Sequence, residues 1–414
     1  MSGPLDVVCE AAVVPIRDPG GEIVAEMHAY AYLADAEEDR PIAFFWNGGP
    51  GASAGLLHFG FAGPVRVEAI DGEPAFTPNE LTLIDVMDLV YVDPIGTGLS
   101  GAVGDAEDAW FWGVETDAKA AAAFVEEFLE KRGMLDRPVV LCGESYGGIR
   151  IAAMLGPLGD RGIEPERLIM ISPALDSRLL RPPSGSIHAR RARADTMPSM
   201  AALAFERGLV DAGDVASFID EAVEFAHGEY IDALEQGEDL PRSEIERLRP
   251  IRDGFTGGMD RDDTGRRDQH DARFRRSEAV MGGVPIDELA GSLRLLLSDV
   301  FEVETGGRYR LMNPSANAAW RAIGGRDRVF NSVVRTPAMV AGSCRGGGCP
   351  EVFIAGGWYD LVTPFSTNER LAAEGAFGDA GVTVRDYRAG HVIYADDEAH
   401  GALIADLRVW LSDG

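Results

Sequence analysis

The sequence predicts an α/β fold, in which helices cover both faces of a mostly parallel sheet. Short apolar runs alternate with helical stretches up to about residue 176, and the alternation resumes near residue 351. Parallel strands need long crossover connections, so this alternation indicates a parallel sheet. The stretch between the two parts is charged and largely helical, which indicates an insertion. We therefore expect a core formed by residues 1–177 and 346–414, with a helical cap at 178–345.

At 414 residues the chain is longer than most single domains, which agrees with a core that carries an insertion. Its net charge of −30 argues against binding to nucleic acids or to anionic membrane surfaces. Charged residues and a proline interrupt the first 20 residues, and no apolar run reaches 18 residues. We therefore predict neither a signal peptide nor a transmembrane helix, and we expect a cytoplasmic protein unless a leader has been removed.

The amino-terminal part contains three strand-like runs. Residues 6–16 and 22–34 are the first two, and Asp-Pro-Gly-Gly at 18–21 predicts a hairpin turn between them. The third run, residues 41–46, ends in Asn-Gly-Gly-Pro-Gly at 47–51. In α/β proteins ligand-binding loops follow the core strands, and glycines leave backbone amides accessible. We expect this glycine loop to face a ligand.

A strand, a tight turn and a helix follow one another in the middle of the amino-terminal part. Residues 138–142 are an apolar strand, the turn reads Gly-Glu-Ser-Tyr-Gly, and residues 149–155 are helical in character. This context for G-x-S-x-G places Ser145 in a sharp turn at a helix amino terminus, where amides favour developing negative charge. The pattern recurs around Ser53, but no strand adjoins that copy. Ser145 is therefore the better candidate nucleophile.

Further elements follow from the same patterns. We expect buried strands at residues 88–92, 167–171, 351–355 and from 382, and helices at 106–131, 201–209, 214–225 and near the carboxyl terminus. Residues 260–276 are highly charged and we assign them no chemistry. His58 lies in an apolar stretch, and we expect it to be a packed histidine.

A serine hydroxyl needs a base to remove its proton, and the base needs a carboxylate to orient it. Asp360 and His391 each lie in a loop just after one of the last two strands, in the order Ser, Asp, His. Those are the positions that an α/β-hydrolase uses. Asp93 also ends a strand, but it precedes the serine. We therefore predict a triad of Ser145, Asp360 and His391.

The developing oxyanion of such a reaction needs two N–H donors. The amide of Tyr146, directly after the nucleophile, is one candidate. The glycine loop offers the second, most plausibly the amide of Gly49.

Four segments together resemble the serine carboxypeptidase family, in that family's order along the chain. They are Trp-Asn-Gly-Gly-Pro-Gly-Ala-Ser at 46–53, Asp93–Ser100 with its G-T-G-x-S, Gly-Glu-Ser-Tyr-Gly-Gly at 143–148, and Gly390-His391. The resemblance implies the α/β-hydrolase fold, with the insertion where the family carries its own. It also implies release of carboxyl-terminal residues from peptides through an acyl-enzyme on Ser145.

The resemblance further implies how a peptide with a free carboxyl terminus is bound. Asn47, the amide of Gly48 and a protonated Glu144 would hold the terminal carboxylate. We expect neither a cofactor nor a metal ion.

The chain departs from the family at two positions and looks like a bacterial branch of it. Many members have a glutamate two residues before the Gly-Pro at 63–64, where this chain has Phe61. Ala52 stands where a cysteine often follows the glycine loop. Loss of a second carboxyl would lower the pKa of Glu144, whereas an apolar neighbour would raise it. We expect desolvation to dominate if Phe61 packs against Glu144.

Other functions remain open at this stage. An esterase, an iminopeptidase or a serine-carboxypeptidase-like acyltransferase would share the fold, although iminopeptidases usually have histidine before the glycine loop and tryptophan after the serine. A binding protein on an inactive scaffold is the non-enzyme alternative. Cys344 and Cys349 could form a disulfide, but a zinc site there lacks further ligands. The sequence leaves side-chain preference and oligomeric state open.

Overall fold

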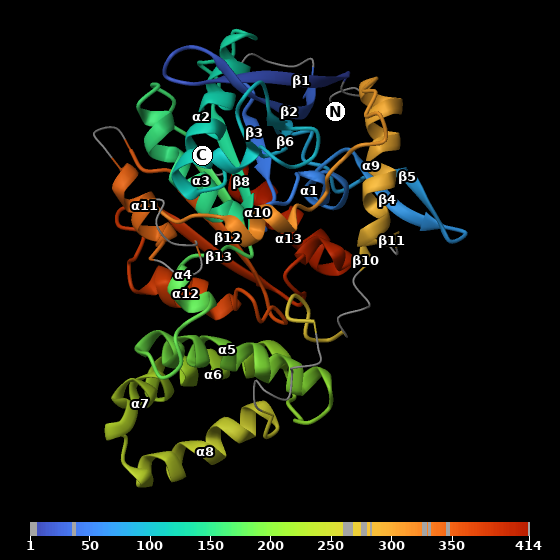
Figure 1. The fold of residues 1–414 in the computed structure, drawn as a ribbon. Helices are drawn as coiled ribbons and strands as arrows, with labels where there is room; N and C mark the ends of the chain where they lie inside the picture. Colours follow the sequence, from blue (N-terminus) through green and yellow to red (C-terminus); the bar gives the residue numbers. More distant parts are fainter. Residues whose placement is uncertain are drawn as a thin grey trace.

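The computed structural model describes residues 6–34, 39–259, 268–274, 280–281, 284–324, 329, 333–344 and 348–412. A sheet of nine strands forms the centre of this part of the chain (Figure 1). Its strands are β1 (Val7–Arg17), β2 (Ile23–Ala34), β3 (Ile42–Trp46), β6 (Asp88–Val92), β7 (Gly101–Ala102), β8 (Val139–Glu144), β9 (Arg167–Ile171), β12 (Glu351–Gly357) and β13 (Val382–Tyr387).

The strands are ordered β1-β2-β6-β3-β8-β9-β12-β13, and β7 pairs with β2. From β6 to β13 all pairings are parallel, whereas β1, β2 and β6 pair antiparallel. β3, β6 and β8 are buried along their whole length, as strands covered on both faces must be. The predicted α/β class and its mostly parallel sheet are confirmed.

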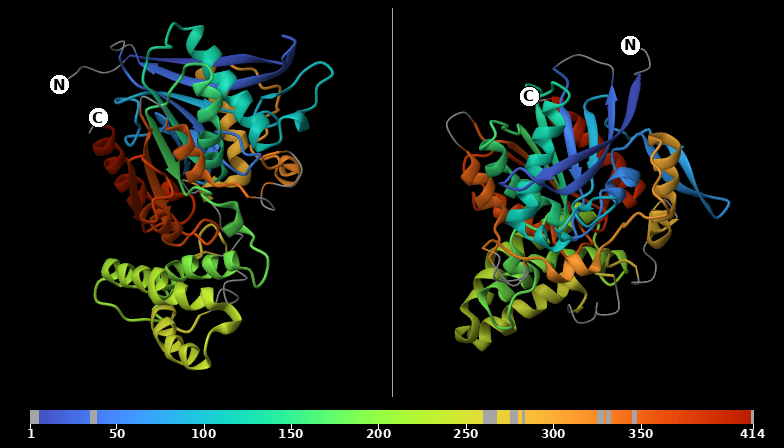
Figure 2. Two further views of the ribbon diagram at one scale, coloured as in Figure 1. Left: turned by 90° about the vertical axis from the view of Figure 1, so that its left-hand side faces the viewer. Right: turned by 45° about the horizontal axis from the view of Figure 1, so that its top comes forward.

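Two layers of helices cover the sheet. α2 (Val114–Glu130), α3 (Tyr146–Gly159) and α11 (Thr336–Ser343) contribute to one apolar core on one face. α1 (Gly55–Gly60), α9 (Ile286–Phe301) and α13 (Asp397–Ser412) contribute to a second core on the other face. The views in Figures 1 and 2 show these two sets on opposite sides of the strands.

The strand order reverses at β3. β6 and β8 both follow β3 in the chain, yet they pair with its opposite edges. Open α/β sheets bind ligands at the carboxyl ends of the strands beside such a reversal. Asn47 directly follows β3 and Ser145 directly follows β8.

Two local features differ from the expectations. The helix expected from residue 106 begins only at Val114, after a short 3₁₀ turn at Asp108–Trp110. The Asp108 carboxylate accepts a hydrogen bond of 2.8 Å from the amide of Ala102, and so holds this turn against β7. The hairpin of β4 (Val65–Ile70) and β5 (Glu73–Pro78) was not expected, because prolines and charges weaken its strand pattern.

Within residues 178–345 the structure separates two groups of helices. α5 (Ile187–Glu206), α6 (Val215–Phe225), α7 (Ile231–Gln236) and α8 (Arg242–Thr256) stand away from the sheet, below it in Figure 1, whereas the short helix α4 (Ser177–Leu180) lies beside α12. α9, α10 (Pro314–Ala319) and α11 lie against the core. We refer to α5–α8 as the cap helices.

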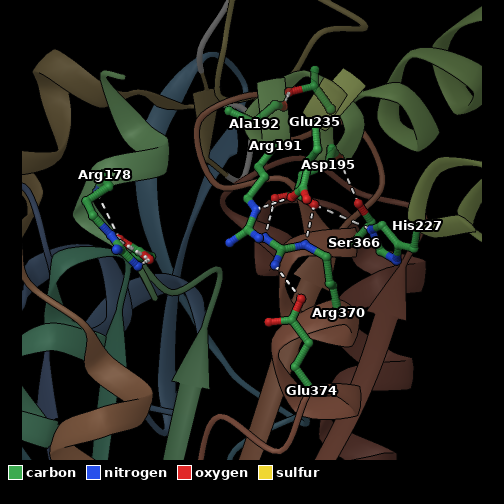
Figure 3. Close-up of polar contacts among 11 residues, drawn as sticks. Arg178, Arg191, Ala192, Asp195, His227, Glu235, Ser366, Arg370 and Glu374 are labelled. Carbon is green, nitrogen blue, oxygen red and sulfur yellow. Dashed lines mark hydrogen bonds and ion pairs between the residues drawn. The ribbon is translucent and has the colours of Figure 1, made fainter. Parts of the chain in front are cut away.

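A buried ion pair joins the cap helices to the core (Figure 3). Asp195 of α5 pairs with Arg370 of α12 (Phe365–Ala373), with Nη2 and Oδ2 2.7 Å apart and both side chains buried. The Ser366 hydroxyl donates to the backbone carbonyl of Asp195, and Arg370 also contacts Glu374. Although burial opposes its ionisation, hydrogen bonds from Arg370 hold the pKa of Asp195 below its usual value. Removing either partner would leave the other as a buried charge without its main counter-ion, which is strongly destabilising.

Cys344 and Cys349 form a disulfide, and the other two cysteines, Cys9 and Cys142, are free. Among the helices that the structure describes, none combines the length and apolar character needed to cross a membrane.

Asp93, at the end of β6, is a fully buried carboxyl group. Its Oδ1 accepts hydrogen bonds of 2.9 Å from the amide of Ala54 and from the hydroxyl of Tyr309. It thereby connects the segment after the glycine loop to the chain that follows α9. Burial raises the pKa of Asp93 to about 7.

Asp93 should make stability depend on pH. Because its folded pKa exceeds the unfolded value of about 4, the folded state binds the extra proton between these pH values, and stability falls as pH rises to about 7. The side chain of Asp93→Asn stays neutral at every pH. The free energy of unfolding of this variant, measured by thermal unfolding, should therefore lack up to about 4 kcal/mol of the change with pH. Asp397→Asn, whose side chain is 87% exposed, is the control and should unfold like the parent protein. Identical pH dependence in the Asp93 variant and the parent would contradict this role.

Candidate active site

Ser145 lies in a backbone conformation that few L-residues adopt. Its φ is 58° and its ψ is −117°, in the turn between β8 and α3. The glycines at 143 and 147 make this turn possible: a Cβ at Gly143 would lie 2.3 Å from the carbonyl oxygen of Gly147. A Cβ at Gly147 would lie 2.5 Å from the carbonyl oxygen of Trp46. The turn is thus held in a strained form that projects one serine, as a nucleophile elbow requires.

The glycine loop after β3 packs directly onto this elbow. A Cβ at Gly48 would lie 2.8 Å from the Cβ of Ser145 and 2.7 Å from the amide nitrogen of Tyr146. Gly49 has a φ of 100°, which favours glycine. Tyr146 is the first residue of α3, so its N–H has no partner inside the helix. The two amides predicted to hold an oxyanion therefore belong to segments in close contact.

Asp360 and His391 meet at the ends of neighbouring strands. β12 and β13 pair in parallel, which brings the loops that follow them side by side. His391 Nδ1 lies 2.5 Å from Asp360 Oδ2, and both side chains are buried. Asp360 also accepts hydrogen bonds from the amides of Val362 and Thr363, and from the Thr363 hydroxyl at 2.6 Å. These donors fix the carboxylate in the orientation that a histidine base needs.

The surroundings of His391 favour its charged form. Burial alone would lower the pKa of His391, but the Asp360 carboxylate, with smaller contributions from Glu144 and Asp268, outweighs burial and raises it. An imidazolium formed during proton transfer would therefore be stabilised at this position.

Ser172 connects the serine elbow to the histidine loop. The Ser145 amide donates to the carbonyl of Ile171, at the end of the neighbouring strand β9, and the amide of Ala174 donates to the carbonyl of Ser145. The Ser172 hydroxyl donates to the carbonyl of His391 at 2.7 Å. The three residues of the predicted triad thus lie on loops that contact one another at the carboxyl ends of the strands.

Glu144, which precedes the nucleophile, is buried in a small polar cluster. Its Oε2 accepts hydrogen bonds from Asn47 Nδ2 and, at 3.0 Å, from the Tyr394 hydroxyl. Its Oε1 is buried and has no partner among the described residues. Burial raises the pKa of Glu144 more than the nearby charge of His391 and these hydrogen bonds lower it. The shift has the direction that desolvation predicts.

Phe61 packs against Tyr394, whose hydroxyl contacts Glu144, so the surroundings of Glu144 include a polar group. The Phe61 ring lies 5.6 Å from that of Tyr394, measured between centroids, and it belongs to the same core. Tyr394 thus brings a neutral hydroxyl to Glu144. Sequence reasoning missed Tyr394, and its only signal was proximity to His391 in the chain.

Arg150 is a second residue of the candidate site that sequence reasoning missed. It is completely buried in the first turns of α3, where its Nε pairs with Asp117 Oδ2 at 2.7 Å. Its Nη1 donates to the backbone carbonyl of Asn47 at 2.7 Å, and so fixes the start of the glycine loop. The available signal was an arginine inside an otherwise apolar helix.

The structure places three alternative candidates away from this chemistry. Ser53 is fully buried, and Asp93 is bonded to Ala54 and Tyr309 instead of a histidine. His58 stacks on Tyr91 with ring centroids 4.4 Å apart, and burial lowers its pKa to about 3. His58 is a packed histidine, as expected.

A small cavity of about 20 Å³ lies between α5 and the segments that follow β9 and β12. Pro173, Val362 and Thr363 line it from the loops near Ser145 and Asp360, while Ala192 and Thr196 line it from α5. Among the cap helices, α5 therefore forms one wall of this cavity.

Residues 24–160 match the family model of the serine carboxypeptidases. This stretch runs from β2 to α3 and contains the glycine loop, Glu144 and Ser145. The chain resembles the serine carboxypeptidases. Asp360 and His391 lie beyond the matched stretch, so the family match does not extend to them. No sequence among the curated proteins matches the chain.

Solved structures resemble this chain at low sequence identity. The prohormone-processing carboxypeptidase Kex1(Δ)p from Saccharomyces cerevisiae superposes with a TM-score of 0.64 at 16% identity, covering 98% of this chain and 91% of that one. An acetylester hydrolase from Corynebacterium glutamicum gives a TM-score of 0.44 at 12% identity, over 98% of this chain and 96% of that one. The likeness to Kex1(Δ)p establishes the α/β-hydrolase fold, which the sequence predicted.

The two serines in G-x-S-x-G patterns provide a matched test of the nucleophile. Ser145→Ala should lower turnover of an activated ester by several orders of magnitude, since loss of a triad nucleophile costs on the order of 10⁶. Ser53→Ala should retain turnover, because Ser53 is buried behind the glycine loop. Steady-state kinetics with p-nitrophenyl esters, on variants shown to be folded by circular dichroism, make the comparison. Loss of turnover in Ser53→Ala alone would overturn the choice of Ser145.

Proposed function

We propose that the protein is a serine-type carboxypeptidase, which releases carboxyl-terminal residues from peptides through an acyl-enzyme on Ser145. The observation that carries this proposal is the position of Glu144. Its carboxyl group is buried directly beside the candidate nucleophile, with Oε2 bonded to Asn47 and Tyr394 and Oε1 without a partner among the described residues. A buried carboxylic acid in this position can donate a hydrogen bond to a substrate carboxylate.

In the proposed reaction, His391 takes the proton from the Ser145 hydroxyl while the oxygen attacks the last peptide carbonyl. The amides of Gly49 and Tyr146 hold the resulting oxyanion, each contributing roughly 3 kcal/mol. His391 then gives its proton to the leaving amine, and the peptide C–N bond breaks to leave an acyl-enzyme. Water, deprotonated by His391, hydrolyses the ester and restores Ser145.

Carboxylate recognition depends on the protonation of Glu144. Only the protonated acid can donate, and burial favours that form by raising the pKa of Glu144. The Tyr394 hydroxyl satisfies Oε2 without adding a negative charge, since burial also holds the pKa of Tyr394 well above its usual value. One neutral acid and the Asn47 side chain would thus serve where two carboxyl groups share a proton in other members.

Blocking the substrate carboxylate tests this proposal directly. N-blocked dipeptides with a free carboxyl terminus should be cleaved at least ten-fold faster than the same peptides as amides, because each charge-assisted hydrogen bond contributes roughly 1.5–3 kcal/mol. Activity on the free acids should decline as pH rises through the pKa of Glu144. In Glu144→Gln the alkaline limb should disappear, since an amide donates at every pH. Product formation is read by mass spectrometry.

Tyr394→Phe is the matched control for this pH dependence. The tyrosine hydrogen bond lowers the pKa of Glu144, so its removal should raise that pKa and move the alkaline limb to higher pH. Equal rates for acids and amides, together with rapid ester hydrolysis, would replace the carboxypeptidase proposal with an esterase.

A further inference from the structure

Residues 268–274 contact both the loop that carries Asp360 and the loop that carries His391. We call this segment the strap. In the chain it falls between the last cap helix, α8, and α9. Nothing in its sequence predicted a role, because a charged stretch usually forms a solvated surface.

The strap brackets Asp360 through backbone hydrogen bonds. On one side of the aspartate, the amide of Ala272 donates to the carbonyl of Tyr359 at 3.0 Å. On the other side, the amide of Leu361 donates to the carbonyl of Gln269 at 2.9 Å. The residues on either side of Asp360 are therefore tied to the same segment.

The strap also contacts the histidine loop. The amide of His391 donates to the carbonyl of His270 at 2.6 Å, and the two imidazole rings meet edge to face with centroids 5.3 Å apart. A Cβ at Gly390 would lie 2.6 Å from both the His270 carbonyl oxygen and the Cβ of Asp271. The glycine before His391 is thus what allows the strap to lie so close.

Arg273 fastens the strap to both loops. Its guanidinium pairs with Asp271 Oδ2 at 2.8 Å, within the strap, and with Asp396 Oδ2 at 3.2 Å, beyond the histidine loop. The same group lies 4.6 Å from the centroid of the Tyr359 ring. Arginine suits this position because its planar group can stack and pair at once.

We propose that the strap positions the catalytic base, by fixing the loops of Asp360 and His391 relative to each other. The inference rests on the proposed triad, but not on the substrate being a peptide. Catalytic groups must be held within about 0.5 Å of the productive geometry, and displacement by about 1 Å can cost 10²-fold in rate. Arg273 and His270 are positioning residues in this account.

The strap contributes charge as well as geometry. The titratable groups facing His391 are Asp360 from the loop after β12, Glu144 from the end of β8, and Asp268 and His270 from the strap. Asp268 accepts from His270 at 3.1 Å, between Oδ1 and Nδ1, and its negative charge favours the protonated form of His391.

Arg273→Met tests the positioning role. With an activated ester as substrate, kcat should fall on the order of 10- to 100-fold while KM changes little, since the strap holds the base and not the substrate. Arg273→Lys should recover part of the loss, because it keeps the charge without the planar stacking. The control is Arg247→Met in α8, which loses ion pairs to Glu229 and Glu244 at 47% exposure and should retain full kcat. Circular dichroism and thermal unfolding establish that each variant is folded.

Asp268→Asn gives a second readout that does not depend on Arg273. Removing this charge should lower the pKa of His391, so the acid limb of kcat/KM should move to lower pH in the variant. A folded Arg273→Met with the parent kcat would overturn the positioning role, and an unmoved acid limb in Asp268→Asn would overturn the contribution of charge. If ester hydrolysis survives in Ser145→Ala, the proposed triad is wrong, and the inference that rests on it fails for that reason.

Discussion

The close approach of two backbone turns is the constraint on which the site depends. Ser145 holds a positive φ between β8 and α3, and the glycine loop after β3 packs against it with no room for a side chain at Gly48. β3 and β8 are neighbouring parallel strands at the point where the strand order reverses, so the sheet itself brings the two turns together. Strain at Ser145 is sustained by the surrounding packing, including the buried Arg150 that fixes the carbonyl of Asn47. The same packing brings the glycine loop against the Tyr146 amide, which is one of the two predicted oxyanion donors.

The other half of the site depends on strand register and on the insertion. Parallel pairing of β12 with β13 brings Asp360 beside His391, and Ser172 connects the histidine loop to the serine elbow. Thr363 and the neighbouring amides donate hydrogen bonds to the Asp360 carboxylate and hold it beside the histidine. In the insertion, α5 lines a small cavity together with Leu361–Pro364, and the strap contacts the loops of both Asp360 and His391. Residues far apart in the chain therefore share one small volume.

The parts of this arrangement that depend on local chain chemistry were predictable from the sequence. Glycine spacing around Ser145 and strand ends before Asp360 and His391 indicated the fold and the candidate residues, because turns and strand periodicity are local properties. Tyr394, Arg150 and the strap were not predictable, since their roles arise from contacts between distant segments. The position of α9 against the core was likewise missed, because an amphipathic helix does not reveal which surface it covers. Residues 260–267 and 275–276 of the charged stretch lie outside the described residues.

The most direct test of the account is the site of covalent labelling by a fluorophosphonate, which reacts with a serine activated by a neighbouring base. The account predicts one label per chain, on the peptide that contains Ser145, and no label after His391→Ala. Peptide mapping by mass spectrometry reads the position. Label on Ser53, or an unlabelled but folded protein, would contradict the claim that Ser145 is an activated nucleophile.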